Sequence, residues 1–177
     1  SLYIPAHAAV SFDMLEPLAH QVHAMGWHLQ LHWTADQIAA HAQTLLRLPV
    51  TYVFDHLARL PVAQGIQHPA YDVVRELLER GRAWVKLSGG YLVSPTLRSD
   101  DPQLLPLARS FIEAAPDRVV WGSDWPHATA SAGRQPMPDD AAQIDALARW
   151  AGDADLLRQI LVTNPEQLYG FTPITSE

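Results

Sequence analysis

The sequence contains no cysteine, and this absence removes several kinds of chemistry. A disulfide framework, a thiolate metal site and a thiol nucleophile all require cysteine. A bound metal would therefore need histidine, aspartate or glutamate ligands. Histidine is plentiful, with nine in the chain, eight of them before residue 69.

Basic side chains are scarce as well. Twelve Lys and Arg residues face nineteen Asp and Glu residues, which gives a net charge of -7, and Lys86 is the single lysine. Proteins that bind nucleic acid gather their basic residues on one stripe or face, and this sequence shows no such stripe. We therefore expect a small-molecule partner and no nucleic acid.

Long apolar runs are also missing. No stretch approaches the ~18 apolar residues that a membrane-spanning helix requires. The opening segment, SLYIPAHAAV, lacks the basic start of a signal peptide. The sequence therefore predicts no membrane partner and a cytoplasmic location. With 48% hydrophobic and 18% charged residues, the composition is that of a folded domain, expected over residues 1–177.

Hydrophobic periodicity predicts alternating strands and helices. Residues 27–33, WHLQLHW, alternate apolar with polar, whereas residues 50–54, VTYVF, are apolar throughout, as in a strand covered on both faces. Further strands are predicted at 83–88 and 118–123. Helices are predicted at 13–25, 34–46, 69–80, 101–115, 139–150 and 153–162, followed by a last turn. The expected helix caps are Asp13, Thr34, Asp101 and Asn164.

This order predicts an α/β fold with a parallel sheet, in which ligands bind beyond the carboxyl ends of the strands. Polar residues collect at those ends: His32, Asp55 and His56, Ser88 to Tyr91, and Ser123 to His127. An open doubly wound sheet and a closed barrel both fit this order. The only glycine-rich candidate loop, SGG at 88–90, meets no phosphate-binding pattern, and a full barrel takes about 250 residues, so a barrel implies a missing part.

Five motifs occur in a characteristic order and spacing. They are GWHLQLHW (26–33), the DH-x-x-R of Asp55, His56 and Arg59, WVKLSGGY (84–91), RVVWGSDWPH (118–127) and NPEQLYGF (164–171). Together they resemble the C-terminal part of the amidohydrolase-2 family, and within it the 2-pyrone-4,6-dicarboxylate lactonases. The resemblance implies a partial (β/α)8 TIM barrel, about strands four to eight, that lacks its N-terminal third. SLYI would be the tail of strand three, and a degenerate strand seven would precede the strand leading to Asp124.

The same resemblance implies a hydrolase in which Asp124 and His56 are catalytic. Asp124 would take a proton from the attacking water, and His56 would polarise the scissile carbonyl. Four residues would contact a small carboxylated substrate: Arg59, Tyr91, His32 and His127. The implied reaction is the opening of a lactone ester bond. It would proceed with no cofactor, or with one divalent ion, zinc or manganese, bound by Asp124 and His56.

The residues by themselves leave alternatives open. Asp124 could be a turn residue, and His56 a hydrogen-bonded core histidine. Leu92 stands where the family commonly has a carboxylate-binding arginine, and Arg98 is a candidate substitute. Lys86, inside a strand, is expected to pair with a carboxylate.

Two other functions are alternatives to hydrolysis. The His-x-His motif that the resemblance implies on strand one is absent from this sequence. The chain could be an inactive remnant whose open strand edges are covered by self-association, since unpaired edges promote association. A decarboxylase on the same scaffold is the other candidate. The expected partners are therefore a carboxylated substrate and a second copy of this chain.

Overall fold

The computed structural model describes residues 11–172, so SLYI lies outside the described part of the chain. Four strands form one parallel sheet in the order β1-β2-β3-β4. Their bounds are β1 (His28–Leu31), β2 (Thr51–Phe54), β3 (Ala83–Leu87) and β4 (Val119–Trp121). The predicted α/β fold with a parallel sheet is confirmed. These strands are half of the eight that close a TIM barrel.

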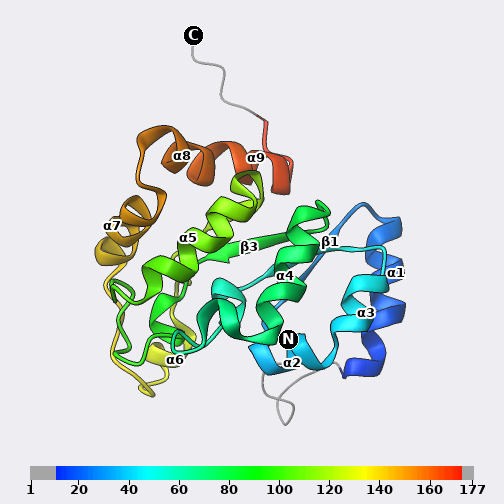
Figure 1. The fold of residues 1–177 in the computed structure, drawn as a ribbon, viewed down its shortest axis with the longest axis horizontal. Coiled ribbons are helices and arrows are strands. Elements are labelled where there is room, and N and C mark those ends of the chain that lie inside the picture. Colours follow the sequence, from blue (N-terminus) through cyan, green and yellow to red (C-terminus); the bar gives the residue numbers. More distant parts are fainter. Residues whose placement is uncertain (1–10, 173–177) are drawn as a thin grey trace.

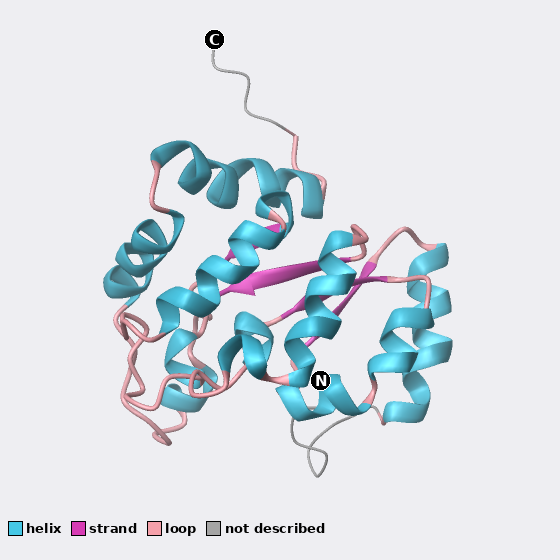
Figure 2. Cartoon of the chain, viewed as in Figure 1, coloured by secondary structure: helices cyan, strands magenta, loops and turns pink. Residues whose placement is uncertain are grey.

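Helices follow each strand, and Figures 1 and 2 show α4 and α5 lying in front of the sheet. The helices are α1 (Leu15–Ala24), α2 (Ala35–Ala40), α3 (Ala42–Arg47), α4 (Pro69–Glu79), α5 (Leu104–Ala114), α6 (Ala128–Ser131), α7 (Asp140–Ala151), α8 (Ala154–Arg158) and α9 (Asn164–Tyr169), with a π-helical turn at Gln159–Thr163. Within residues 11–172, none of them has both the length and the apolar character to cross a bilayer.

The two faces of the sheet differ in chemistry because side chains alternate along each strand. Tyr52 and Phe54 of β2 belong to the large core formed with the helices. Val53, between them, points the other way. It packs with Trp84 and Val120, and the partly buried Leu168 of α9 packs against this cluster. The main apolar burial thus lies on the helix side, and each large apolar side chain removed from water there stabilises the fold by ~1.5–3 kcal/mol.

The expected degenerate seventh strand is not found. β3 pairs directly with β4, from Val85 opposite Val119 to Leu87 opposite Trp121. In the described chain, the segment between these strands forms α5 and short turns. Helical spacing explains this difference, since Leu104, Leu107 and Phe111 all bury on one face of α5.

The predicted helix starts are correct in part. Thr34 caps α2 in a capping box with Gln37, each side chain bonding the other residue's backbone N–H. Asp13 does not cap α1, which begins at Leu15 after a 3-10 turn and has no side-chain cap. Glu16, three residues after Asp13, binds Arg47 through both carboxylate oxygens.

Asp101 and Asn164, the expected caps of α5 and α9, make other contacts. Asp101 accepts a bond from the backbone N–H of Gln103, but the helix itself begins at Leu104. Asn164 makes no cap. Its amide group donates to the carbonyl oxygens of Pro116 and Val119, at 2.8 and 2.7 Å, and so ties α9 to the start of β4.

Candidate active site

The candidate site lies beyond the carboxyl ends of β2, β3 and β4, on the side of the sheet opposite to the main core. Val53 and Val120 face that side, and even-numbered steps from them lead to Asp55 and Asp124. The structure brings the predicted catalytic pair together, with His56 Nε2 3.5 Å from Asp124 Oδ1.

Asp124 sits in a tight turn three residues beyond β4. Its carbonyl accepts a 2.7 Å bond from the His127 N–H, and its φ is +68°, a left-handed conformation that aspartate adopts more readily than most residues. Its Oδ2 accepts a 2.6 Å hydrogen bond from the Tyr91 hydroxyl. The side chain is 28% exposed, and Oδ1 lies 3.5 Å from His56 Nε2, a longer contact than the one between Oδ2 and Tyr91.

An unusual backbone run places His56. Residues 56 to 59 all have left-handed φ values, 52°, 55°, 54° and 55°, directly after β2. Each such conformation costs a non-glycine residue roughly 1–2 kcal/mol, and clustered strain of this kind is characteristic of functional sites. After this run, the His56 ring lies against Ser88 and Gly89, which follow β3, and near Asp124, which follows β4.

The His56 ring is tightly enclosed. Its Nδ1 lies 3.0 Å from the Ser88 hydroxyl oxygen, and a Cβ on Gly89 would come within 2.5 Å of the same nitrogen. Burial lowers the pKa of His56 to about 4, although the nearby Asp124 carboxylate acts in the opposite direction. His56 is therefore neutral at pH 7. A neutral imidazole can donate a hydrogen bond or bind a metal through Nε2.

His32 lies beside His56, with ring centroids 4.9 Å apart in an edge-on arrangement. Burial also lowers the pKa of His32. Ligand atoms of His32, Asp55 and His56 all lie within 4.8 Å of one another, which is a spacing compatible with a metal ion. His32 is thus in the site, next to the predicted catalytic pair.

Asp55 is already engaged by other groups. Both of its oxygens accept from the Gln30 amide, at 3.1 and 3.0 Å, and the Lys86 ammonium lies 3.2 Å from Oδ1. The salt bridge expected for Lys86 is therefore confirmed. Because a cation already neutralises Asp55, this carboxylate is a poor metal ligand, and Asp124 is the better placed carboxylate beside His56.

Tyr91 and His127, both predicted to contact substrate, are buried and bonded to each other. The Tyr91 hydroxyl lies 3.3 Å from His127 Nδ1, and His127 Nε2 lies 3.0 Å from Asp140 Oδ1. Burial and the bonded Asp124 carboxylate raise the pKa of Tyr91 above its usual value. Tyr91 therefore stays protonated and donates to Asp124.

Arg59 ends the left-handed run and lines a cavity of about 260 Å³ together with Thr34, Asp36 and Leu92. Its positive charge contributes to lowering the pKa of both His32 and His56, so it lies close to the site. A guanidinium at this edge is suited to a carboxylate ligand.

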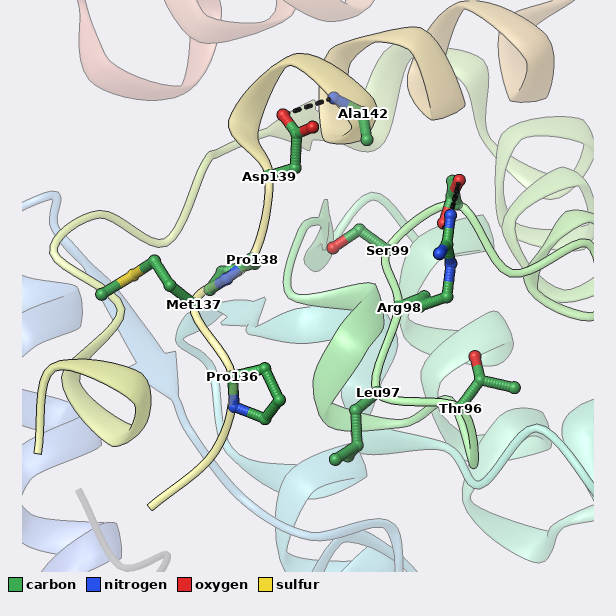
Figure 3. Close-up of a pocket in the computed structure, with 10 residues that line it drawn as sticks. Thr96, Leu97, Arg98, Ser99, Pro136, Met137, Pro138, Asp139 and Ala142 are labelled. Carbon is green, nitrogen blue, oxygen red and sulfur yellow. Dashed lines mark hydrogen bonds and ion pairs between the residues drawn. The ribbon is translucent and has the colours of Figure 1, made fainter. Parts of the chain in front are cut away.

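Arg98, the candidate substitute for a missing arginine, lies in a different place. It forms two bonds with Asp100, at 2.8 and 2.7 Å, on the exposed loop after β3. Figure 3 shows this loop across a pocket of about 310 Å³ from Met137 and Pro138. Arg98 is thus committed to a neighbouring carboxylate.

Two of the remaining histidines, His68 and His41, have structural partners. His68 caps α4 through Nδ1 and pairs with Asp36 through Nε2. His41 stacks on Phe12 with centroids 4.0 Å apart. His7 lies outside residues 11–172.

Sequence reasoning missed several residues in the site or beside it. Ser88 and Gly89 were recognised only as a strand end, and their contact with His56 depends on how β2 and β3 pair. Asp140 was not singled out, because nothing in PDDAAQ indicates that one carboxylate would face His127. Asp139, beside it, caps α7 in the ordinary way.

Comparison with known proteins gives the family. The amidohydrolase family model matches residues 5–171. A 4-sulfomuconolactone hydrolase from Hydrogenophaga intermedia is 30% identical over 94% of this chain and 55% of its own length. A 2-pyrone-4,6-dicarboxylate hydrolase from Comamonas testosteroni is 31% identical over 89% of this chain and 53% of its own length.

Solved structures agree in fold. A crystal structure from Agrobacterium tumefaciens, without ligand, has a TM-score of 0.79 and 27% identity, covering 94% of this chain and 58% of that one. A Burkholderia multivorans amidohydrolase with bound zinc has a TM-score of 0.67 at 18% identity, covering 87% of this chain and 56% of that one. The chain thus spans about half the length of these relatives. It belongs to the amidohydrolase family, of which it carries part of the barrel.

Proposed function

We propose that this chain is the catalytic part of a hydrolase that opens the ester bond of a small carboxylated lactone. The observation that carries the proposal is the geometry of Asp124. One of its oxygens is fixed by Tyr91 at 2.6 Å, and the other faces the neutral His56 at 3.5 Å in a partly exposed position. A carboxylate held in this way is suited to general base catalysis.

In the proposed reaction, Asp124 Oδ1 accepts a proton from the attacking water and returns it to the leaving oxygen. His56 Nε2 lies on the same side and would donate a hydrogen bond to the carbonyl oxygen, on which negative charge grows in the transition state. The Ser88 hydroxyl can donate to Nδ1, which keeps the proton on Nε2.

A carboxylated substrate is supported by charge and by the relatives. Arg59 offers a planar donor fork at the edge of the site. The names of two relatives, a 4-sulfomuconolactone hydrolase and a 2-pyrone-4,6-dicarboxylate hydrolase, both specify anionic lactones. Arg59, His32, Tyr91 and His127 remain our candidates for shaping the substrate's surroundings. Tyr91 and His127 would act through Asp124, because both are buried behind it.

A divalent metal fits the site in part. Two ligand atoms on one tetrahedral zinc lie roughly 3.3 Å apart for bonds of about 2.0–2.1 Å, and His56 Nε2 and Asp124 Oδ1 are 3.5 Å apart. His56, Asp124 and the adjacent His32 would hold such an ion, which would polarise the carbonyl when bound. Asp55 would stay with Lys86. Zinc and manganese are the proposed ions if one is used.

We also propose that a second copy of this chain covers the open sheet. Among the described residues, β1 pairs only with β2, and β4 only with β3, so each has one free edge. Two copies related by a two-fold axis along the barrel would supply eight parallel strands. A monomer by light scattering, at concentrations up to 100-fold above those of the activity assay, would contradict this arrangement.

The test of function is an assay for hydrolysis of 2-pyrone-4,6-dicarboxylate and of 4-sulfomuconolactone. The release of acid is measured with and without added zinc or manganese. The sample is the polypeptide expressed from its natural gene, with its intact mass measured, beside the 177-residue chain. We expect lactone opening that Asp124→Asn abolishes. Conversion of a lactone into an isomer without acid release would favour the second candidate, suggested by a D-galactarolactone isomerase from Agrobacterium fabrum that is 27% identical over 94% of this chain. No turnover of any lactone would overturn both.

A further inference from the structure

A line of polar contacts leads away from Asp124 to a residue outside the candidate site. From Asp124 Oδ2 it passes to the Tyr91 hydroxyl at 2.6 Å, then to His127 Nδ1 at 3.3 Å, and from His127 Nε2 to Asp140 Oδ1 at 3.0 Å. This line of contacts joins the short turn after β3, the turn after β4 and the first residue of α7. Only its two ends reach solvent, with Asp124 28% and Asp140 51% exposed.

The geometry points to Asp140 as a positioning residue that fixes the tautomer of His127 and so leaves the Tyr91 hydroxyl with two acceptors. This inference rests on the proposed function, in which Asp124 gains and loses a proton in each cycle.

His127 is 4% exposed, and a buried ring N–H without an acceptor is costly. Asp140 is an acceptor at Nε2, so it favours the proton on that nitrogen and leaves Nδ1 as an acceptor. The N–H is not well aligned on the carboxylate oxygen, so the contact is mainly electrostatic.

Asp140 is itself held in place. The Gln143 amide donates to Asp140 Oδ1 at 2.8 Å and to the Ser123 carbonyl at 3.1 Å. Gln143 is buried, and Ser123 directly precedes Asp124. The start of α7 is therefore fastened to the turn that carries the base.

The Tyr91 hydroxyl has one proton and two neighbouring acceptors, Asp124 Oδ2 and His127 Nδ1. While Asp124 is a carboxylate, the shorter contact shows that Tyr91 donates to it. Once Asp124 Oδ1 has taken a proton, Oδ2 is a weaker acceptor, and the hydroxyl can turn to His127 Nδ1. If His127 carried its proton on Nδ1 instead, it would donate to Tyr91 and hold the hydroxyl on Asp124 throughout, making Asp124 a weaker base.

The test is nitrogen NMR of the His127 ring in the 177-residue chain, metal-free, in wild type and in Asp140→Ala. The shifts distinguish a protonated ring nitrogen from an unprotonated one. We expect the Nε2–H tautomer in wild type and a shift toward Nδ1–H in Asp140→Ala. Asp140→Asn, whose amide oxygen still accepts, should keep the wild-type tautomer and shows whether the fold survives a change here.

Asp139→Ala is the matched control. Asp139 lies on the same helix end but caps the backbone N–H groups of Ala141 and Ala142, so its loss should destabilise α7 and leave the His127 tautomer unchanged. A wild-type Nδ1–H tautomer, or the same tautomer in Asp140→Ala as in wild type, would overturn the inference.

Kinetics then separate this inference from the proposed function. In a preparation that opens a lactone, Asp140→Ala should lower kcat about tenfold, the value of one hydrogen bond to a charged group, with KM unchanged. Asp140→Asn and Asp139→Ala should stay near wild type. If no lactone is opened by wild type, the proposed function fails while the NMR result still decides whether Asp140 positions His127.

Discussion

Asp55 and Asp124 both follow an apolar strand at the same edge of the sheet, yet they meet different surroundings. Asp55 is buried, with both oxygens bonded by Gln30 and a salt bridge to Lys86. Asp124 is partly exposed, has one oxygen bonded by a neutral hydroxyl, and lies near a neutral histidine. A carboxylate with a cation bound is an anchor, whereas one bound only by neutral donors can exchange its proton.

The largest effect should come from removing the exchangeable carboxylate. Asp124→Asn is expected to lower kcat by about 10²- to 10⁴-fold, the usual contribution of a general base, while the free energy of unfolding changes little. Lactone hydrolysis and urea unfolding of the same sample check this prediction. Turnover at the wild-type rate would remove Asp124 from catalysis and erase its contrast with Asp55.

Asp55 should show the opposite behaviour. Asp55→Asn leaves the half-buried Lys86 without its counter-ion, and we expect a loss of about 2–3 kcal/mol in unfolding free energy, somewhat less than for a fully buried pair. Adding Lys86→Met should restore much of that loss, because the unpaired charge is then gone. Urea midpoints of the two single variants and the double variant measure it. Additive losses would show that the pair contributes nothing as a pair.

Gly89 tests how the His56 ring is held beside Asp124. Gly89→Ala puts a Cβ within 2.5 Å of His56 Nδ1 at a φ of +55°, so we expect a loss of about 2 kcal/mol in stability together with reduced turnover. Gly133→Ala is the control, since its φ is +70° but nothing lies within 4 Å. It should lose only about 1 kcal/mol. Equal losses in both variants would show that contact with His56 has no effect.

The pH dependence of stability tests whether His56, beside Asp124, is buried in its neutral form. Its folded pKa of about 4 lies below the unfolded value of ~6.5, so between them the unfolded chain binds more protons. Stability is therefore complete above pH 6.5 and falls as the pH is lowered, by about 2 kcal/mol at pH 5 from this group. Burial lowers the pKa of His32 too, which adds in the same direction.

Urea unfolding at pH 7 and pH 5, in metal-free buffer, measures this dependence. His56→Gln should show a smaller loss between the two values than wild type. An identical loss in both proteins would mean that His56 is not buried in its neutral form.

The smallest effect is expected at Arg98. Because its side chain is exposed and paired with Asp100, Arg98→Ala should change stability by no more than about 0.5 kcal/mol and leave KM for the lactone unchanged. Arg59→Ala, at the cavity beside the site, is the comparison and should raise KM. A large rise in KM for Arg98→Ala would show that the loop moves toward Asp124 when substrate binds.

Much of the fold followed from local patterns. Apolar runs and helical spacing predicted the four strands and most of the helices, and Thr34 was correctly predicted to open the second helix. The failures have a common cause. Glu16 and Asn164 stand at positions typical of helix caps. Instead, Glu16 binds Arg47 and Asn164 binds the start of β4, and both partners are distant in the chain.

The candidate site also has some features that the sequence predicts and others that depend on the folded chain. That His56 and Asp124 follow two strands of one parallel sheet could be predicted from the sequence, because parallel strands bring their carboxyl ends to one edge. The four left-handed residues after β2 have no counterpart in local preference, since no glycine stands among residues 56 to 59. The contact that Gly89 permits with His56 depends equally on strand pairing.

The sequence by itself determined the alternation of strands and helices, the family motifs, and the carboxylates and histidines at the strand ends, because these depend on neighbours in the chain. Only the tertiary structure decided which carboxylate became an anchor and which stayed exchangeable. The physical reason is that a carboxylate's behaviour is set by the charges and donors around it. Lys86 reaches Asp55, and Tyr91 reaches Asp124, only after the strands have paired.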